Sequence, residues 1–205
     1  MRAALTGLIA AILILTLSDI IVLHLERSRA ADFDLALRAV VHSTATGWLT
    51  KAIRVLTWLG SDLVLGAVSV GSFIVLRRRG CRARAWLPAV AFAAASVVTQ
   101  AAKFLVRRPR PEPFFALARP ETWSFPSGHS LNSMVCCLAV AAALAPPASR
   151  RRWIAAAIAL SLLTGFTRVY LGVHWPTDVL TGWAAGACLG SGFVLGDWWR
   201  SPPAE

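Results

Sequence analysis

The chain has 205 residues, of which 57% are hydrophobic, and it carries a formal net charge of +11. This composition is too apolar for an ordinary soluble domain, and the apolar residues form blocks rather than a stripe with the period of an amphipathic helix. The basic residues cluster between the blocks, where they orient helices in a membrane, so the charge does not indicate a nucleic-acid partner. We predict one integral membrane domain spanning residues 1–205.

A bilayer core requires about 20 apolar residues per helix, and six stretches of the chain approach that length. Arg2 precedes the first stretch, as in a signal peptide, but the run is long for one and is followed by a poor cleavage site. We therefore expect the first stretch to remain as a helix in an all-α bundle of six transmembrane helices. The expected spans are 3–23, 55–76, 86–106, 131–145, 153–169 and 175–196.

Arginines crowd two short connections, at 77–84 after the second span and at 150–152 after the fourth. The positive-inside rule places these connections, and with them both termini, in the cytoplasm of a multi-pass protein of the plasma (inner) membrane. The polar segments 25–54 and 107–127, and the turn near 168–175, then face the periplasm or exterior. Apolar residues recur every three to four positions in 25–54, which favours a helix lying in the interface.

Several other polar residues are better explained by structure than by chemistry. The four cysteines have no metal-ligand spacing, and Cys136, Cys137 and Cys188 lie in apolar runs, which favours buried thiols. Asp19 and Asp62 are expected to make hydrogen bonds at helix ends. His42 is expected to be a surface residue of the interfacial segment.

Lys103 lies in the last turn of the third span and is followed by "FLVRRPRP". Taken alone, a lysine so close to a helix end is better explained by snorkelling to the lipid headgroups. Pro109 and Pro111, however, end the helix and hold Arg110 just beyond it, within reach of the ammonium group. A lysine and an arginine placed in this way suit a multiply charged oxyanion.

The second polar feature is "PSGH", which precedes the fourth span. Ser127 or Gly128 is expected at the N-cap, so the first helical turn presents unpaired amides and the positive end of the helix dipole to an anion. Gly128 allows an anion to approach the backbone, and His129 is a candidate general acid. In isolation, a capping turn with a partly exposed histidine explains the motif better.

The third feature is "TRVYLGVHWPTDVL", between the last two spans. Arg168 ends the fifth span, and Pro176 suits the first position of the sixth. If helical geometry extends back to His174, the Asp178 carboxylate lies on the same face and orients one ring nitrogen, leaving the other free to attack. For the pattern in isolation, a His-Asp pair that merely caps a helix is the preferred explanation.

The predicted topology brings these three features to one face of the membrane. Together they form a phosphoryl-transfer site that needs no metal and no other cofactor, and this face has no carboxylate cluster suited to magnesium. The three motifs resemble the signature of the type 2 phosphatidic acid phosphatase superfamily of lipid phosphatases. Its first part is matched by Lys103, Arg110 and Pro111, its second by residues 126–129, and its third by Arg168, His174 and Asp178.

The resemblance implies a role for each matched residue. His174 would take the phosphoryl group as a phosphohistidine, Asp178 would orient it, and His129 would protonate the leaving oxygen. The remaining matched residues would bind the substrate phosphate: Lys103, Arg110, Ser127, Gly128 and Arg168. Thr167 stands where the family usually has serine and keeps the hydroxyl group.

The expected substrate is a lipid phosphate from the bilayer. Undecaprenyl (polyprenyl) diphosphate is the leading expectation, because Arg107 or Arg108 is available for a second phosphate. Phosphatidylglycerol phosphate and phosphatidic acid are the alternatives. A protein of another class, one that binds or transports lipid without catalysis, is disfavoured because all eight site residues are intact.

Overall fold

We describe the fold from a computed structural model, which describes residues 2–20, 27–115 and 122–196. Within these ranges the regular structure is entirely helical, with short 3₁₀ turns at Thr57–Gly60 and Pro147–Ser149. The helices are α1 (Arg2–Asp19), α2 (Arg27–Ser43), α3 (Gly47–Leu56), α4 (Asp62–Arg78), α5 (Arg82–Ala85), α6 (Leu87–Val106), α7 (Gly128–Leu144), α8 (Arg150–Tyr170) and α9 (Pro176–Leu195).

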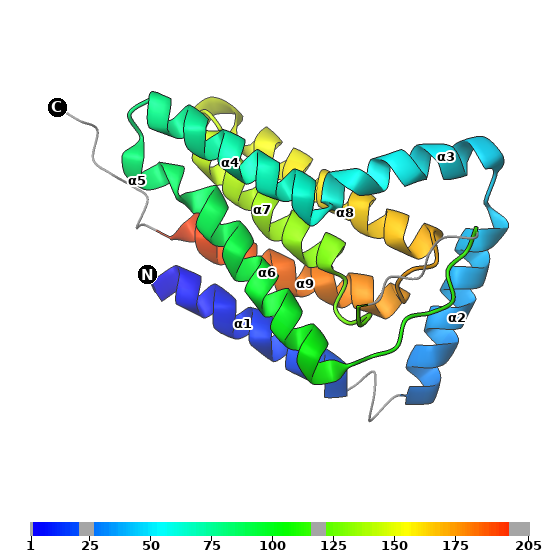
Figure 1. Cartoon of the computed structure of the whole chain (residues 1–205). Helices are drawn as coiled ribbons and strands as arrows, with labels where there is room; N and C mark the ends of the chain where they lie inside the picture. Colours follow the sequence, from blue (N-terminus) through cyan, green and yellow to red (C-terminus); the bar gives the residue numbers. More distant parts are fainter. Residues whose placement is uncertain (1, 21–26, 116–121, 197–205) are drawn as a thin grey trace.

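Six of the helices, α1, α4, α6, α7, α8 and α9, lie side by side and alternate in direction along the chain (Figure 1). Helix α7 occupies the centre and packs against α4, α6, α8 and α9, and most of its side chains are buried. Because α6 and α8 end where α7 and α9 begin, all the predicted site residues lie toward one end of the bundle.

Glycines on α9 allow α7 to approach its backbone closely. A Cβ atom added at Gly182 would lie 2.9 Å from the Ser127 carbonyl oxygen, and one at Gly186 would lie 2.9 Å from that of Leu131. Small residues spaced four apart form a flat face, and such faces bring membrane helices together. This contact fixes the start of α7 against the start of α9.

The outward faces of the helices carry large exposed apolar side chains, as expected for a surface in contact with lipid. Four helical segments of the described chain are long and apolar enough to cross a membrane, and they correspond to the first, third, fifth and sixth predicted spans. They are Arg2–Asp19, Arg82–Val106, Pro147–Tyr170 and Pro176–Leu195.

The predicted second span is wrong at its start. Residues 55–60 belong to α3 and the following 3₁₀ turn, and the axis bends by 49° before α4 begins at Asp62. The bend has a local cause, because the Ser61 side chain caps α4 by accepting a hydrogen bond from the Val64 amide at 3.3 Å. Counted as one broken span, the pair would be the fifth.

Helix α7 begins at Gly128, three residues before the apolar run of the predicted fourth span and next to the predicted N-cap. Its 17 residues correspond to a length of about 25 Å, less than the roughly 30 Å hydrocarbon core. Helix α7 is therefore shorter than a full span.

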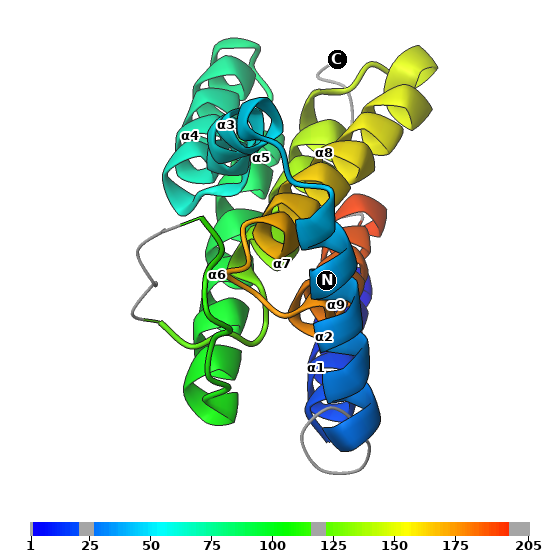
Figure 2. The ribbon, with the colours of Figure 1, turned by 90° about the vertical axis from the view of Figure 1, so that its right-hand side faces the viewer.

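The predicted interfacial segment forms two helices. Helix α2 crosses the end of the bundle at a steep angle and lies over the loops that precede α7 and α9 (Figures 1 and 2). The arginine clusters at 77–84 and 150–152 lie at the opposite end, near the start of α1. The bundle therefore has one end with arginine clusters in its short connections and one end closed by α2.

Candidate active site

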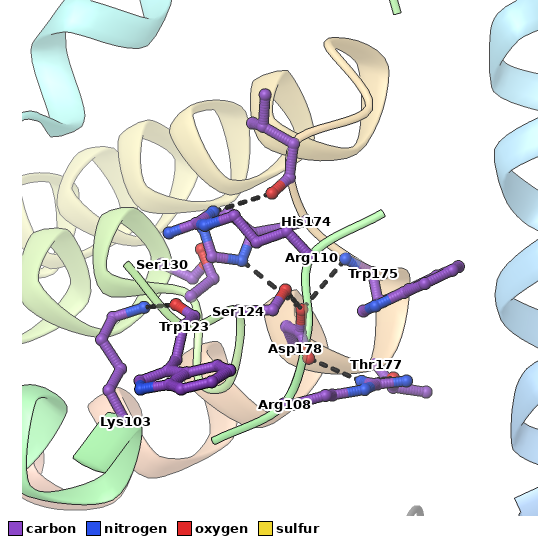
Figure 3. Close-up of polar contacts among 12 residues, drawn as sticks. Lys103, Arg108, Arg110, Trp123, Ser124, Ser130, His174, Trp175, Thr177 and Asp178 are labelled. Atoms are coloured by element: carbon purple, nitrogen blue, oxygen red, sulfur yellow. Dashed lines mark hydrogen bonds and ion pairs between the residues drawn. The ribbon is translucent and has the colours of Figure 1, made fainter. Parts of the chain in front are cut away.

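Three chain segments meet beneath α2: residues 107–111 after α6, residues 122–130 leading into α7, and residues 168–178 between α8 and α9. Figure 3 shows Arg110, His174 and Asp178 turned toward one another, with Lys103 to one side. The three motifs that lie far apart in the sequence thus come together as predicted.

His174 lies in the loop before α9, and its side chain is only 3% exposed. Arg110 Nη1 lies 2.8 Å from His174 Nε2. Since a guanidinium can only donate, Nε2 must be the acceptor, and the proton of the neutral ring is therefore on Nδ1. Nδ1 faces Asp178 Oδ2 at 3.5 Å and makes no hydrogen bond of good geometry to the residues that the structure describes. This tautomer leaves a lone pair on Nε2.

Asp178 is completely buried and occupies the third position of α9. Its Oδ2 accepts hydrogen bonds from the Ser124 hydroxyl and, at 3.0 Å, from the Trp175 amide. Helical geometry does not extend back to His174, because α9 begins at Pro176, yet the two side chains still face each other. The capping contact with the Trp175 amide, rather than an extended helix, holds the carboxylate beside the imidazole.

The environment of His174 opposes protonation. Burial lowers its pKa well below the ordinary histidine value, and the positive charges of Arg110, Lys103 and Arg168 lower it further. The imidazole is therefore neutral at physiological pH, the state that a nucleophile requires.

Arg110 and Lys103 are both nearly buried and are held by backbone oxygens. Arg110 donates to the carbonyl oxygens of Thr122 and Val173, each at 2.7 Å, and Lys103 Nζ donates to that of Trp123. The backbone at residues 122–123 therefore helps to hold both cations in place near His174.

Arg168 lies in the last turn of α8 and donates through Nη1 to the Thr57 hydroxyl at 2.9 Å. Its Nε is buried and has no hydrogen-bond partner within the described ranges. A buried guanidinium N–H without an acceptor is costly, and a phosphate oxygen would satisfy it.

Ser127 is the N-cap of α7, and Gly128 is its first residue, as predicted. The first amides of α7, beginning with that of Gly128, have no acceptor within the helix, which makes this end a seat for an anion. His129 follows in the first turn, and its ring packs against Gly60, where an added Cβ atom would lie 3.1 Å from Cδ2. Arg168, His174, Arg110 and Lys103 all interact electrostatically with His129, so it belongs to the same cluster.

Other contacts of the site were not predicted. Arg108, expected only as a possible ligand for a second phosphate, forms buried ion pairs with both Asp178 and Asp34. Ser124 donates to Asp178, and Thr57 accepts from Arg168. A second arginine in "RRPRP" is a signal for Arg108, but nothing near Asp34 or Thr57 in the sequence marks them.

The two polar residues expected to have structural roles differ in outcome. Asp62, at the start of α4, accepts a hydrogen bond from the Asn132 amide at 3.0 Å, as expected. Asp19 Oδ1 is buried and has no hydrogen-bond partner among the residues described, so the expected contact is not seen there. His42 is exposed on α2 and stacks on Phe114, with ring centroids 4.1 Å apart.

Comparison with known proteins identifies the family. The PAP2 superfamily model matches residues 84–202, which include every predicted site residue. The chain belongs to the PAP2 superfamily. It is 30% identical over 177 residues to phosphatidylglycerophosphatase B of Bacillus subtilis, covering 82% of this chain and 83% of that protein. It is 34% identical over 172 residues to decaprenylphosphoryl-5-phosphoribose phosphatase of Mycobacterium tuberculosis, covering 80% and 90% of the two chains.

Solved structures show the same relationship. The fold matches the crystal structure of a transmembrane PAP2-type phosphatidylglycerolphosphate phosphatase from Bacillus subtilis with a TM-score of 0.77 and 26% identity. The match covers 89% of this chain and 91% of that one. This PAP2 protein is a multi-pass membrane phosphatase that acts on lipid phosphate esters.

Proposed function

We propose that this PAP2 protein removes a terminal phosphate from a membrane lipid without a metal ion, through a phosphohistidine on His174. The observation that carries the proposal is the His174 tautomer: Arg110 lies on Nε2, and Nδ1 faces Asp178. A neutral imidazole in this orientation has its lone pair directed at the cluster of cations.

In the first step the phosphate oxygens bind Lys103, Arg110, Arg168 and the first amides of α7. His174 Nε2 attacks phosphorus, the bond from phosphorus to the lipid oxygen breaks, and His129 gives its proton to that oxygen. The imidazole then carries a positive charge, which the Asp178 carboxylate stabilises through Nδ1–H.

In the second step water attacks the phosphorus of the phosphohistidine while His129 accepts a proton from it. The phosphorus–nitrogen bond breaks, inorganic phosphate leaves, and both histidines return to their starting states. His129 thus donates a proton in the first step and regains one in the second, as a general acid and base must.

The contacts of the two arginines after α6 favour a different substrate from the one expected from the sequence. A second phosphate was expected to use Arg107 or Arg108, but Arg108 is buried between two carboxylates, and Arg107 is exposed and packs on Phe104 of its own helix. The buried cations that remain, Lys103, Arg110 and Arg168, match one phosphate group. We therefore place a lipid phosphate monoester, such as phosphatidylglycerol phosphate or phosphatidic acid, ahead of polyprenyl diphosphate.

A diphosphate substrate stays as the second candidate for a specific reason. The chain is 35% identical over 105 residues to a protein named undecaprenyl-diphosphatase from Sulfolobus acidocaldarius, a match that covers 49% of this chain. In either case the site lies at the end of the bundle closed by α2, where a lipid headgroup is within reach.

A phosphate-release panel tests the proposal. Purified protein in detergent is given phosphatidylglycerol phosphate, phosphatidic acid and undecaprenyl diphosphate, each with and without EDTA. We expect the fastest release from a monoester, no effect of EDTA, and complete loss in His174→Ala. Activity that disappears with chelation would contradict the metal-independent mechanism, and faster release from the diphosphate would reverse the order of substrates.

A further inference from the structure

Arg108 is a buried arginine that the phosphate-binding scheme does not use. Its Nη1 donates to Asp178 Oδ1 at 2.6 Å and to the Thr177 hydroxyl at 2.8 Å, and its Nη2 donates to Asp34 Oδ2 at 2.7 Å. One guanidinium therefore joins the carboxylate beside the nucleophile to a carboxylate on α2 (Figure 3 shows the Arg108–Asp178 side of this arrangement).

Asp34 has no exposed surface, and both of its oxygens are used. Oδ1 accepts from the Thr177 amide at 2.8 Å, and Oδ2 accepts from the Thr177 hydroxyl at 2.8 Å as well as from Arg108. The Thr177 amide belongs to the first turn of α9, where amides have no acceptor within the helix. Asp34 therefore caps α9 from a different helix.

The contacts divide the two oxygens of Asp178 between different donors. Oδ2 accepts from Ser124 and Trp175 and faces His174, whereas the only donor recorded for Oδ1 among the described residues is Arg108. Without Arg108, Oδ1 would be a buried carboxylate oxygen with no partner. The donors to Oδ2 would still hold that oxygen, but the plane of the carboxylate would no longer be fixed relative to the imidazole.

Phosphate binding by Arg108 is disfavoured by charge. Asp34, Arg108 and Asp178 together carry a net charge of −1, and they are buried. A phosphate could reach Arg108 only by breaking two buried ion pairs and approaching two carboxylates. The same guanidinium lies over the Trp175 ring, 5.4 Å from its centroid, which further restricts approach.

We infer that Arg108 is a positioning residue that holds Asp178 against His174, and that Asp34 on α2 holds Arg108 in that orientation. The inference rests on the proposed roles of His174 and Asp178. It makes α2 part of the catalytic apparatus, although the PAP2 match begins at residue 84, beyond this helix.

Helix α2 is tied to the site at other points as well. Arg38, one turn after Asp34, donates to the Glu112 carbonyl oxygen at 2.7 Å and lies over the Phe114 and Trp175 rings. These contacts hold α2 in place through residues other than Asp34, so a substitution at Asp34 tests mainly the Asp34–Arg108–Asp178 ion pairs rather than the attachment of the helix.

The test compares steady-state kinetics of Arg108→Gln, Asp34→Asn and the double variant, with Arg107→Gln as the matched control. Arg107 is the adjacent arginine, it is exposed, and its loss changes the net charge equally. We expect Arg108→Gln to lower kcat about 10- to 100-fold, since a small misplacement of a catalytic group has effects of this size. KM, and the inhibition constant of inorganic phosphate, should change less than about threefold.

The remaining variants are expected to show that the two residues act as one unit. Asp34→Asn should lower kcat less than Arg108→Gln does, and the double variant should be no slower than Arg108→Gln alone. Arg107→Gln should stay within about twofold of the wild type in each constant. Each kcat is expressed per folded protein, measured from the monodisperse peak in detergent.

Three results would overturn the inference. A rise in KM and in the phosphate inhibition constant at unchanged kcat would make Arg108 a phosphate ligand. Additive effects of the two substitutions on kcat would show that Arg108 and Asp34 act independently. A wild-type kcat in the folded fraction of both variants would leave the two residues a purely structural role. If Arg108→Gln does not fold, Arg108→Lys replaces it, because an ammonium group keeps the charge without bridging both carboxylates in the same way.

Asp178→Asn, measured in parallel, separates this inference from the proposed function. Wild-type turnover in Asp178→Asn would overturn the proposed nucleophile arrangement, and this inference with it. Impaired turnover in Asp178→Asn with normal turnover in Arg108→Gln would overturn this inference alone.

Discussion

His174 shows how a few contacts set the chemistry of a single side chain. Arg110 requires Nε2 to be an acceptor, burial and three cations keep the ring neutral, and Asp178 lies on the other side. Each effect follows from residues named by the sequence motifs, but their distances come only from the fold.

At the residue scale we first predict that Asp178→Asn lowers kcat by about 10³- to 10⁴-fold, the effect seen when an orienting carboxylate is lost beside a catalytic histidine. The amide would present a donor to Nδ1–H and favour the wrong tautomer. Phosphate release per folded protein measures the change. Turnover within tenfold of the wild type would contradict the assigned role.

A second residue-scale prediction concerns pH. The charge of Arg110 lowers the pKa of His174, and the reactive neutral form is lost as the pH falls through that pKa. Arg110→Gln removes the charge, so the acidic limb of kcat/KM should move to higher pH, whereas in Arg110→Lys it should move less. Ionisation of the substrate cancels in this comparison, because the substrate is the same. Identical acidic limbs in the two variants would contradict the electrostatic explanation.

At the scale of elements, the contact between α7 and α9 determines where the proposed phosphate site lies. Gly182 and Gly186 let the two backbones touch, and the start of α7 is thereby held over the start of α9. The sequence predicted both helices but not this contact, because a glycine in a hydrophobic run does not reveal which helix it faces.

We predict that Gly186→Ala destabilises the protein by about 1–3 kcal/mol, since the added methyl group has no room. Its Cβ atom would lie 2.9 Å from the Leu131 carbonyl oxygen and from Met134 Cβ. Thermal unfolding in detergent measures the change. Gly71→Ala on α4 is the control: no atom lies within 4 Å of its added Cβ, and helix propensity should make the substitution neutral or stabilising. Equal losses in both variants would contradict the packing argument.

The bend at Ser61 and the break between α2 and α3 lay beyond sequence prediction for a related reason. Hydropathy alone marks where a chain is apolar, and residues 55–60 are apolar enough to continue a span. The serine cap and the change of axis at Ser61 decide the boundary. The role of Asp34 could not be predicted from the sequence either, because the residues that it contacts in the site lie 74 or more positions away along the chain.

At the scale of the whole molecule, the two ends of the bundle differ in how they are built. Short connections crowded with arginines form one end, and the site, with its own buried arginines, and α2 form the other. The family, the helical architecture and the convergence of the three motifs were all predictable from sequence, because each depends on composition or on a fixed motif. The six-span topology, with both termini in the cytoplasm and the site outside, stays a prediction.

Cysteine labelling tests this topology. Ser43 is exposed at the end of α2, and Cys81 lies in the arginine-rich connection at the opposite end. In intact cells a membrane-impermeant maleimide should label Ser43→Cys in a Cys81→Ser background. The native Cys81 should be labelled only after the cells are permeabilised. The reverse pattern would invert the topology and place the site on the cytoplasmic side.

The contact between Arg110 and His174 Nε2 also has a consequence for the proposed mechanism. The guanidinium engages the same lone pair that the proposed attack requires, so Arg110 would have to turn onto the phosphate oxygens before Nε2 could react. Under this mechanism, recognition of the phosphate and release of the nucleophile would be a single event.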